Sequence, residues 1–199
     1  LCVCLTLCSC GSNESAEKPS AASSDTVAKD SSPATTAAAG SRDNTPVVLT
    51  GSADGTVTYG NDSVTVDASH TEEGYLMVSY SGSNSKVKLQ ITGSDEITYT
   101  YNLHDGYETF PLTSGSGSYT VGVFENIEGT SYSTLFTQAI DVTIQDEFGP
   151  YLYANQYVNF SADSKVISKA MELSASANDD LEVIENVYNY IITNFTYDY

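Results

Sequence analysis

The sequence predicts a mainly β protein, an immunoglobulin-like antiparallel β-sandwich that follows a disordered tether and precedes a short α-helical segment. Three observations predict it. Apolar and polar residues alternate over much of residues 47–144, and clusters of Gly, Ser, Asn and Asp separate the alternating runs. The apolar period then changes to that of a helix after Gly149 and Pro150. The 199 residues leave room for one domain or two small ones.

The first ten residues, LCVCLTLCSC, contain all four cysteines of the chain. A metal site or a disulfide knot is disfavoured, because no histidine lies near and low-complexity sequence follows. The run Leu7-Cys8-Ser9-Cys10 resembles a bacterial lipobox at the end of an apolar signal segment. We therefore expect residues 1–9 to be the end of a lipoprotein signal peptide, and Cys10 to carry the lipid. The protein is then exported and anchored to the outer face of the cytoplasmic membrane.

Residues 10–46 are mostly Ser, Ala, Thr, Asp and Glu, with few large apolar side chains. Such a segment buries too little surface to offset the entropy of ordering it. We expect it to be a flexible tether between the membrane and the folded part.

The alternating runs of residues 47–146 predict the strands of the sandwich. The cleanest is 86–91, where Val87, Leu89 and Ile91 share one face. The predicted strands are residues 64–68, 75–80, 86–91, 97–103, 119–123 and 139–144. Turn residues separate them at 81–84, 93–95, 114–117 and 128–129. About 100 residues is the size of an immunoglobulin-like domain.

Several polar and aromatic residues of this region are candidates for a functional or structural role. Tyr119 follows a Gly-rich turn and opens a late strand, so it is placed for a tyrosine-corner contact. Exposed tyrosines can stack on sugars, although cross-strand packing is their commoner role. His104, Asp105 and Glu108 are expected in one loop, where an acid–base role would need a nucleophile that does not accompany them.

The net charge of −19 excludes a nucleic-acid partner, because such a chain repels phosphate backbones. No acidic run has the spacing of a calcium loop, so we expect no metal and no cofactor. The acidic dipeptides 54–55, 61–62 and 105–106 are typical of turns.

The helical period fills residues 147–199. A first helix is predicted over 163–174, with Ser161 or Asp163 as its cap, and a second from Asn178 or Asp179. Leu181, Ile184 and Tyr188 belong to the apolar stripe of the second helix.

The stretch 185–198, ENVYNYIITNFTYD, resembles the lead-in to the catalytic part of transglutaminase-like, papain-type cysteine domains. Pieces at 110–112, 117–119, 125–126 and 153–158 resemble a sandwich that precedes such domains in lipoproteins of Gram-positive bacteria. The resemblance implies a Cys-His-Asp triad that attacks amides. No catalytic residue is carried over, because no cysteine follows Cys10 and neither His70 nor His104 matches a triad position.

Together these features predict a fragment, cut at both ends, of an exported transglutaminase-like lipoprotein. The resemblance implies that the parent acts on amides of cell-surface proteins or peptides, by acyl transfer or hydrolysis. The alternative is a non-enzymatic surface module, an adhesin or a glycan- or peptide-binding sandwich whose helices complete the fold.

Overall fold

The computed structural model describes residues 39–198. These residues form two compact units. One contains residues 46–168, and the other contains residues 39–45 together with 169–198. The boundary expected between residues 146 and 147 lies inside the first unit.

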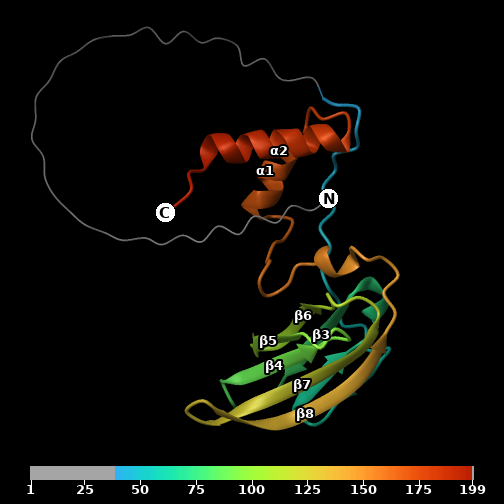
Figure 1. Cartoon of the computed structure of the whole chain (residues 1–199), viewed down its shortest axis with the longest axis vertical. Helices are drawn as coiled ribbons and strands as arrows, with labels where there is room; N and C mark the ends of the chain where they lie inside the picture. The colour runs from blue at the N-terminus through green and yellow to red at the C-terminus, as the bar shows by residue number, and fades with distance from the viewer. Residues whose placement is uncertain (1–38, 199) are drawn as a thin grey trace, which may run out of the picture. The chain divides into compact units, whose positions relative to one another are not determined.

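The first unit is a β-sandwich of two antiparallel four-stranded sheets (Figure 1). In order across the first sheet, the strands are β1 (Thr58–Gly60), β2 (Val64–Asp67), β3 (Tyr75–Tyr80) and β6 (Gly106–Pro111). In order across the second, they are β5 (Thr98–Leu103), β4 (Val87–Thr92), β7 (Gly117–Glu128) and β8 (Ser131–Val142). The chain changes sheet after β3, β5 and β6, as in Greek-key sandwiches. The predicted fold class, a mainly β antiparallel sandwich followed by a short helical segment, is confirmed.

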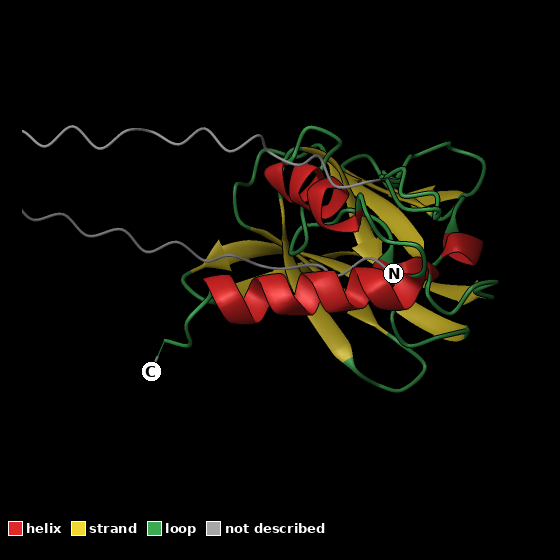
Figure 2. Ribbon diagram, turned by 90° about the horizontal axis from the view of Figure 1, so that it is seen from above, coloured by secondary structure: helices red, strands yellow, loops and turns green. Residues whose placement is uncertain are grey.

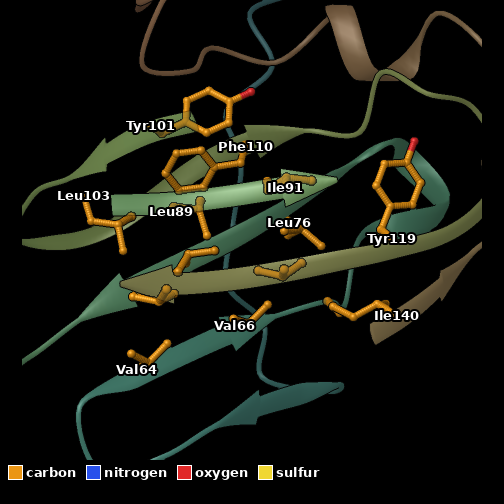
Figure 3. Close-up of a cluster of buried hydrophobic side chains, with 14 of the residues drawn as sticks. Val64, Val66, Leu76, Leu89, Ile91, Tyr101, Leu103, Phe110, Tyr119 and Ile140 are labelled. Atoms are coloured by element: carbon orange, nitrogen blue, oxygen red, sulfur yellow. The ribbon is translucent and has the colours of Figure 1, made fainter. Parts of the chain in front are cut away.

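The core lies between the two sheets, where apolar side chains from both inner faces meet (Figure 3). Val87, Leu89 and Ile91 of β4 all point inward, as their alternation predicts. The other large, fully buried side chains include Val64, Val66, Leu76, Val78, Phe110, Leu112, Tyr119, Val121 and Val123.

Strand β3 is buried on both faces, which explains why its alternation is the least regular in the sequence. Its outward-facing Tyr75 and Met77 are covered by neighbours. The ring of Tyr153 lies 4.4 Å from that of Tyr75, and Thr109 Oγ1 lies 3.0 Å from Met77 Sδ.

Three features of the sheets differ from the sequence prediction. Strand β1, at one edge of its sheet, was not predicted. Glu108, expected in a loop with His104 and Asp105, lies within strand β6, which was not predicted. Strands β7 and β8 are also longer than their predicted cores, because the hairpin runs on to a turn at Gly129. There the chain adopts a left-handed conformation that glycine tolerates best.

The tyrosine corner is present. The Tyr119 hydroxyl donates a 2.8 Å hydrogen bond to the backbone oxygen of Gly115, four residues upstream. Burial raises the pKa of the Tyr119 phenol. The contact fixes the loop between β6 and β7 to the start of β7.

Replacing Tyr119 by phenylalanine is expected to lower the free energy of unfolding by about 1 kcal/mol, because the ring is kept and one buried hydrogen bond is lost. Urea unfolding measures the change. Tyr99→Phe, at a more exposed ring of β5, is the matched control and should change stability by less than about 0.5 kcal/mol. Equal stability of both variants would contradict a stabilising role for the corner.

Two helices follow the sandwich strands, α1 (Lys165–Ser174) and α2 (Asp180–Asn194). Asp179 caps α2, since its Oδ1 accepts a 2.9 Å hydrogen bond from the Glu182 amide, as predicted. Within the second unit, Arg42 Nε lies 2.8 Å from Asp180 Oδ1.

Helix α2 is a single uninterrupted helix (Figure 2) that buries none of its residues. Leu181 is 72% exposed and Tyr188 is 60% exposed, and Ile184 and Ile192 are exposed as well. These four residues follow one another at helical spacing and form what we call the α2 stripe. A stripe of this kind is normally buried against another element.

Candidate functional site

The predicted lipidation residue, Cys10, lies outside the described residues, as do Cys2, Cys4 and Cys8. Lipidation therefore stays a prediction.

His104, Asp105 and Glu108 do lie together, at the passage from β5 to β6. Both the backbone N–H and the Nδ1 of His104 contact the Glu108 carboxylate, at 2.8 and 3.0 Å. Gln156 Nε2 lies 3.1 Å from the same carboxylate, while Asp105 forms a β-bridge to Tyr80. Glu108 is thus half-buried and hydrogen-bonded rather than solvated. This geometry ties the two strands together.

The same Gln156 helps to close the outer edge of β5. Its amide donates to the backbone oxygen of Asn102 at 2.6 Å, and the Tyr157 hydroxyl donates to that of Thr100 at 3.3 Å. The Tyr157 ring also packs on Tyr101, with centroids 5.4 Å apart. Edge strands expose unpaired backbone groups, and these two side chains occupy such groups on β5.

A second polar cluster surrounds His70, and sequence reasoning did not find it. Ser52 Oγ lies 3.2 Å from His70 Nε2, and Glu73 Oε2 lies 3.2 Å from Nδ1. Asp54 Oδ2 also approaches Nε2, at 3.0 Å. The imidazole stacks on Tyr75 at 5.2 Å and 9°. The Ser52–His70–Glu73 series has the connectivity of a serine-nucleophile triad.

The carboxylate of Asp54 determines what chemistry this cluster can perform. A general base must present the lone pair of Nε2 to the serine hydroxyl. Here that lone pair would also face the negative charge of Asp54. Asp54 Oδ2 also lies nearer to Nε2 than Ser52 Oγ does, so Nε2 is placed to bond Asp54 while Nδ1 bonds Glu73. The cluster then acts as a clamp between the 52–54 loop and the turn before β3.

This interpretation predicts that Ser52 does not react as a catalytic serine. A fluorophosphonate probe should label neither the native chain nor its Ser52→Ala variant, as judged by intact-mass spectrometry. The Asp54→Asn variant lacks the carboxylate that competes for Nε2. Comparing its labelling with that of the native chain is therefore the more stringent test. Labelling of the native chain that Ser52→Ala abolishes would contradict the clamp.

A groove of about 630 Å3 lies where the β6–β7 loop meets the segment after β8. Phe148, 63% exposed, and Tyr151 form aromatic walls, and Asp146 and Glu147 provide carboxylates. Its other lining residues are Thr113, Gly115, Ser116, Ile144, Gln145 and Pro150. With two acids and no basic residue in its lining, the groove suits a cationic or a polar ligand.

Comparison with family models, curated proteins and solved structures finds no match for this chain. Over residues 39–198, no group of three or more His, Cys, Asp or Glu side chains is arranged to hold a metal ion. None of the helices in that part of the chain is long and apolar enough to cross a membrane.

Sequence reasoning missed the groove and the His70 cluster for the same reason. Ser52 is 18 residues from His70, and the groove combines the loop after β6 with residues 144–151. The only local signal was a pair of exposed aromatic residues beside two acids at 146–151.

Proposed function

We propose that this chain belongs to an exported, lipid-anchored transglutaminase-like protein that acts on amides of cell-surface proteins or peptides. In this proposal the sandwich spaces or positions a catalytic domain to which α2 belongs. A cysteine thiolate of that domain attacks the amide carbonyl, and ammonia or an amine leaves. Water or a second amine then takes the acyl group. The residues for this step are absent from the chain.

The observation that carries the proposal is the α2 stripe, which the described residues of its own unit leave exposed. After α2, Phe195 leaves in an extended conformation, at φ −118° and ψ 138°. In transglutaminase-like domains, which the sequence resembles, a helix likewise passes into an extended Tyr-Asp segment just before the catalytic part. An apolar stripe of this length is expected to be covered in the working protein.

The first test is to sequence the gene beyond both ends of the chain. A reading frame that continues into a cysteine at a helix start, then a histidine and an aspartate, would support the proposal. Incorporation of an amine probe into a glutamine peptide, abolished by mutating that cysteine, would then establish the activity. A stop codon directly after Tyr199 would refute the enzymatic function.

The lipid anchor is tested separately by feeding cells an alkyne-tagged fatty acid. Label on the native protein that Cys10→Ser abolishes and Cys8→Ser retains would support lipidation at Cys10. Label on both variants would refute that assignment.

A second candidate function is a non-enzymatic surface module that binds peptides or glycans. The specific observation in its favour is the groove with Phe148 and Tyr151, because exposed aromatic side chains beside carboxylates are typical of binding surfaces. Retention of the purified chain on sonicated peptidoglycan or on a surface-peptide array, lost in Phe148→Ala with Tyr151→Ala, would support it. Equal retention of the double variant would refute binding at this groove.

A further inference from the structure

The sandwich has four edge strands, and they differ in how far their outer backbone groups are protected from pairing with another strand. Strand β1 has only three residues, and the β5 edge is capped by Gln156 and Tyr157. Strand β6 is short, ends in Pro111 and has its Glu108 tied to Gln156. Strand β8 has 12 residues and is the outermost strand of its sheet (Figure 1).

The register identifies which backbone groups of β8 face outward. The amide of Asn126 on β7 donates to Lys86 in the direction of β4. By alternation, Tyr119, Val121 and Val123 direct their backbone groups to β8, where they pair with Ile140, Gln138 and Phe136. The intervening residues Thr137, Ala139 and Asp141 therefore direct their N–H and C=O groups away from the sheet.

This edge lacks the usual protection against pairing. From Phe136 to Val142 the register with β7 is unbroken, and the segment has no Pro or Lys and only one charge, Asp141. In the described part of the chain, side chains reach two carbonyls on the outer side of β8. Asn61 donates to Leu135 O beyond the bulge, and Gln138 donates to Ala139 O. Among residues 39–198, no side chain accepts a hydrogen bond from the outward N–H groups of Thr137, Ala139 and Asp141.

The charges around β8 select the partner. Asp141 lies near the C-terminal end of the strand, and the groove with Asp146 and Glu147 follows directly. No Lys, Arg or His occurs from residue 105 to residue 164. A basic side chain from β4, Lys88, does contact β8, but its Nζ lies 5.5 Å from the ring centroid of Tyr132, at the opposite end of β8 from Asp141. A second copy would bring the same acids together in a chain of net charge −19. A basic partner is attracted instead.

We propose that the outer edge of β8, from Phe136 to Val142, binds an extended Lys- or Arg-containing peptide as a fifth strand of its sheet. The peptide backbone pairs with Thr137, Ala139 and Asp141, and its basic residue lies against Asp141 and the acidic groove. This inference rests on the binding-module function proposed above and names its ligand class.

The probe is a fluorescent peptide that alternates valine and threonine and carries two lysines, placed at either end in two versions. At least one version is expected to bind the purified chain, as measured by fluorescence anisotropy. Ala139→Pro removes one outward N–H but no hydrogen bond to β7, so the fold should survive. It is expected to weaken binding about tenfold or more, while the matched Ala139→Val variant stays within about twofold.

The charge argument is tested in the same assay. Asp141→Asn and Glu147→Gln should each weaken binding of the lysine peptide about threefold at low ionic strength. They should leave binding of a peptide with serines in place of the lysines unchanged. Circular dichroism establishes that each variant is folded.

Failure of both lysine peptides to bind would overturn the inference, as would equal binding by a folded Ala139→Pro variant. A dimer in sedimentation that Ala139→Pro abolishes, with no peptide binding, would identify a second copy as the occupant and overturn it too. If the chain fails to bind the lysine peptides but still binds peptidoglycan, the binding-module proposal stands. If it binds neither the lysine peptides nor peptidoglycan, that proposal fails as well.

Discussion

Replacing Phe110 by alanine is expected to lower the free energy of unfolding of the sandwich by about 3–5 kcal/mol. The Phe110 side chain is 0% exposed and lies between the sheets, where its ring meets that of Tyr101 edge-on at 4.9 Å and 63° (Figure 3). Alanine removes this aromatic contact and leaves a cavity that the two sheets close only in part. A typical domain is stable by about 5–15 kcal/mol, so the loss is a large fraction of the total.

Urea unfolding of the native chain and the variant measures the change. Tyr107→Ala is the matched control, because Tyr107 belongs to the same strand and is 46% exposed. The control should lose less than about 1 kcal/mol. A similarly small loss in Phe110→Ala would mean that the two sheets do not pack through this residue.

The Phe110→Ala variant should also loosen the edge of β5 that Gln156 and Tyr157 close. Phe110 supports Tyr101, and Tyr101 in turn packs on Tyr157, which caps the backbone oxygen of Thr100. Amide hydrogen exchange in β5 is therefore expected to speed up more than exchange in β8, which receives no such support.

The strands were predictable where one face is buried and the other is wet. The alternation of Val87, Leu89 and Ile91 follows because these side chains face the core while Lys88 and Gln90, between them, lie on the more exposed outer face of β4. Strand β6 gave a weaker signal, because only Phe110 of its six residues is fully buried and Asp105-Gly106 is typical of a turn. The outer halves of β7 and β8 were missed because no residue there is fully buried, so neither face carries a clear apolar alternation.

The candidate sites were much less predictable than the strands. Local rules did identify Tyr119 and Asp179, since a corner tyrosine and a helix cap bond to residues a few positions away. The contacts of Gln156 span 48 and 54 residues, and no periodicity reports contacts of that range. The open edge of β8 is also a property of the strand order, which one sequence alone does not determine.

Replacing Asp67 by asparagine is the second substitution with a large expected effect. Asp67 is almost fully buried at the end of β2, and each of its carboxylate oxygens accepts a backbone hydrogen bond. Gly55 N lies 2.6 Å from Oδ2, and Ser69 N lies 2.9 Å from Oδ1. Asparagine offers one oxygen and one NH2 group, so one of the two donors is left without an acceptor. The expected loss is about 2–3 kcal/mol at neutral pH.

The loss should also depend on pH in a defined direction. Burial opposes the charge on Asp67, but the hydrogen bonds from Ser69 and Gly55 outweigh burial and hold the pKa of the carboxyl below its usual value of 3.8. On acidification the unfolded chain therefore takes up this proton before the folded chain does. The stabilisation by ionised Asp67 is complete above the unfolded-state pKa and is lost as the pH falls through the folded-state pKa.

Thermal or urea unfolding of both proteins as a function of pH provides the measurement. The difference in stability between the native chain and Asp67→Asn should be largest near neutrality and should shrink below about pH 4. Asp62→Asn, at an exposed aspartate in the turn before β2, should show no such change. A difference that stays constant down to about pH 2 would mean that the backbone donor left without an acceptor, and not the lost charge, accounts for the effect.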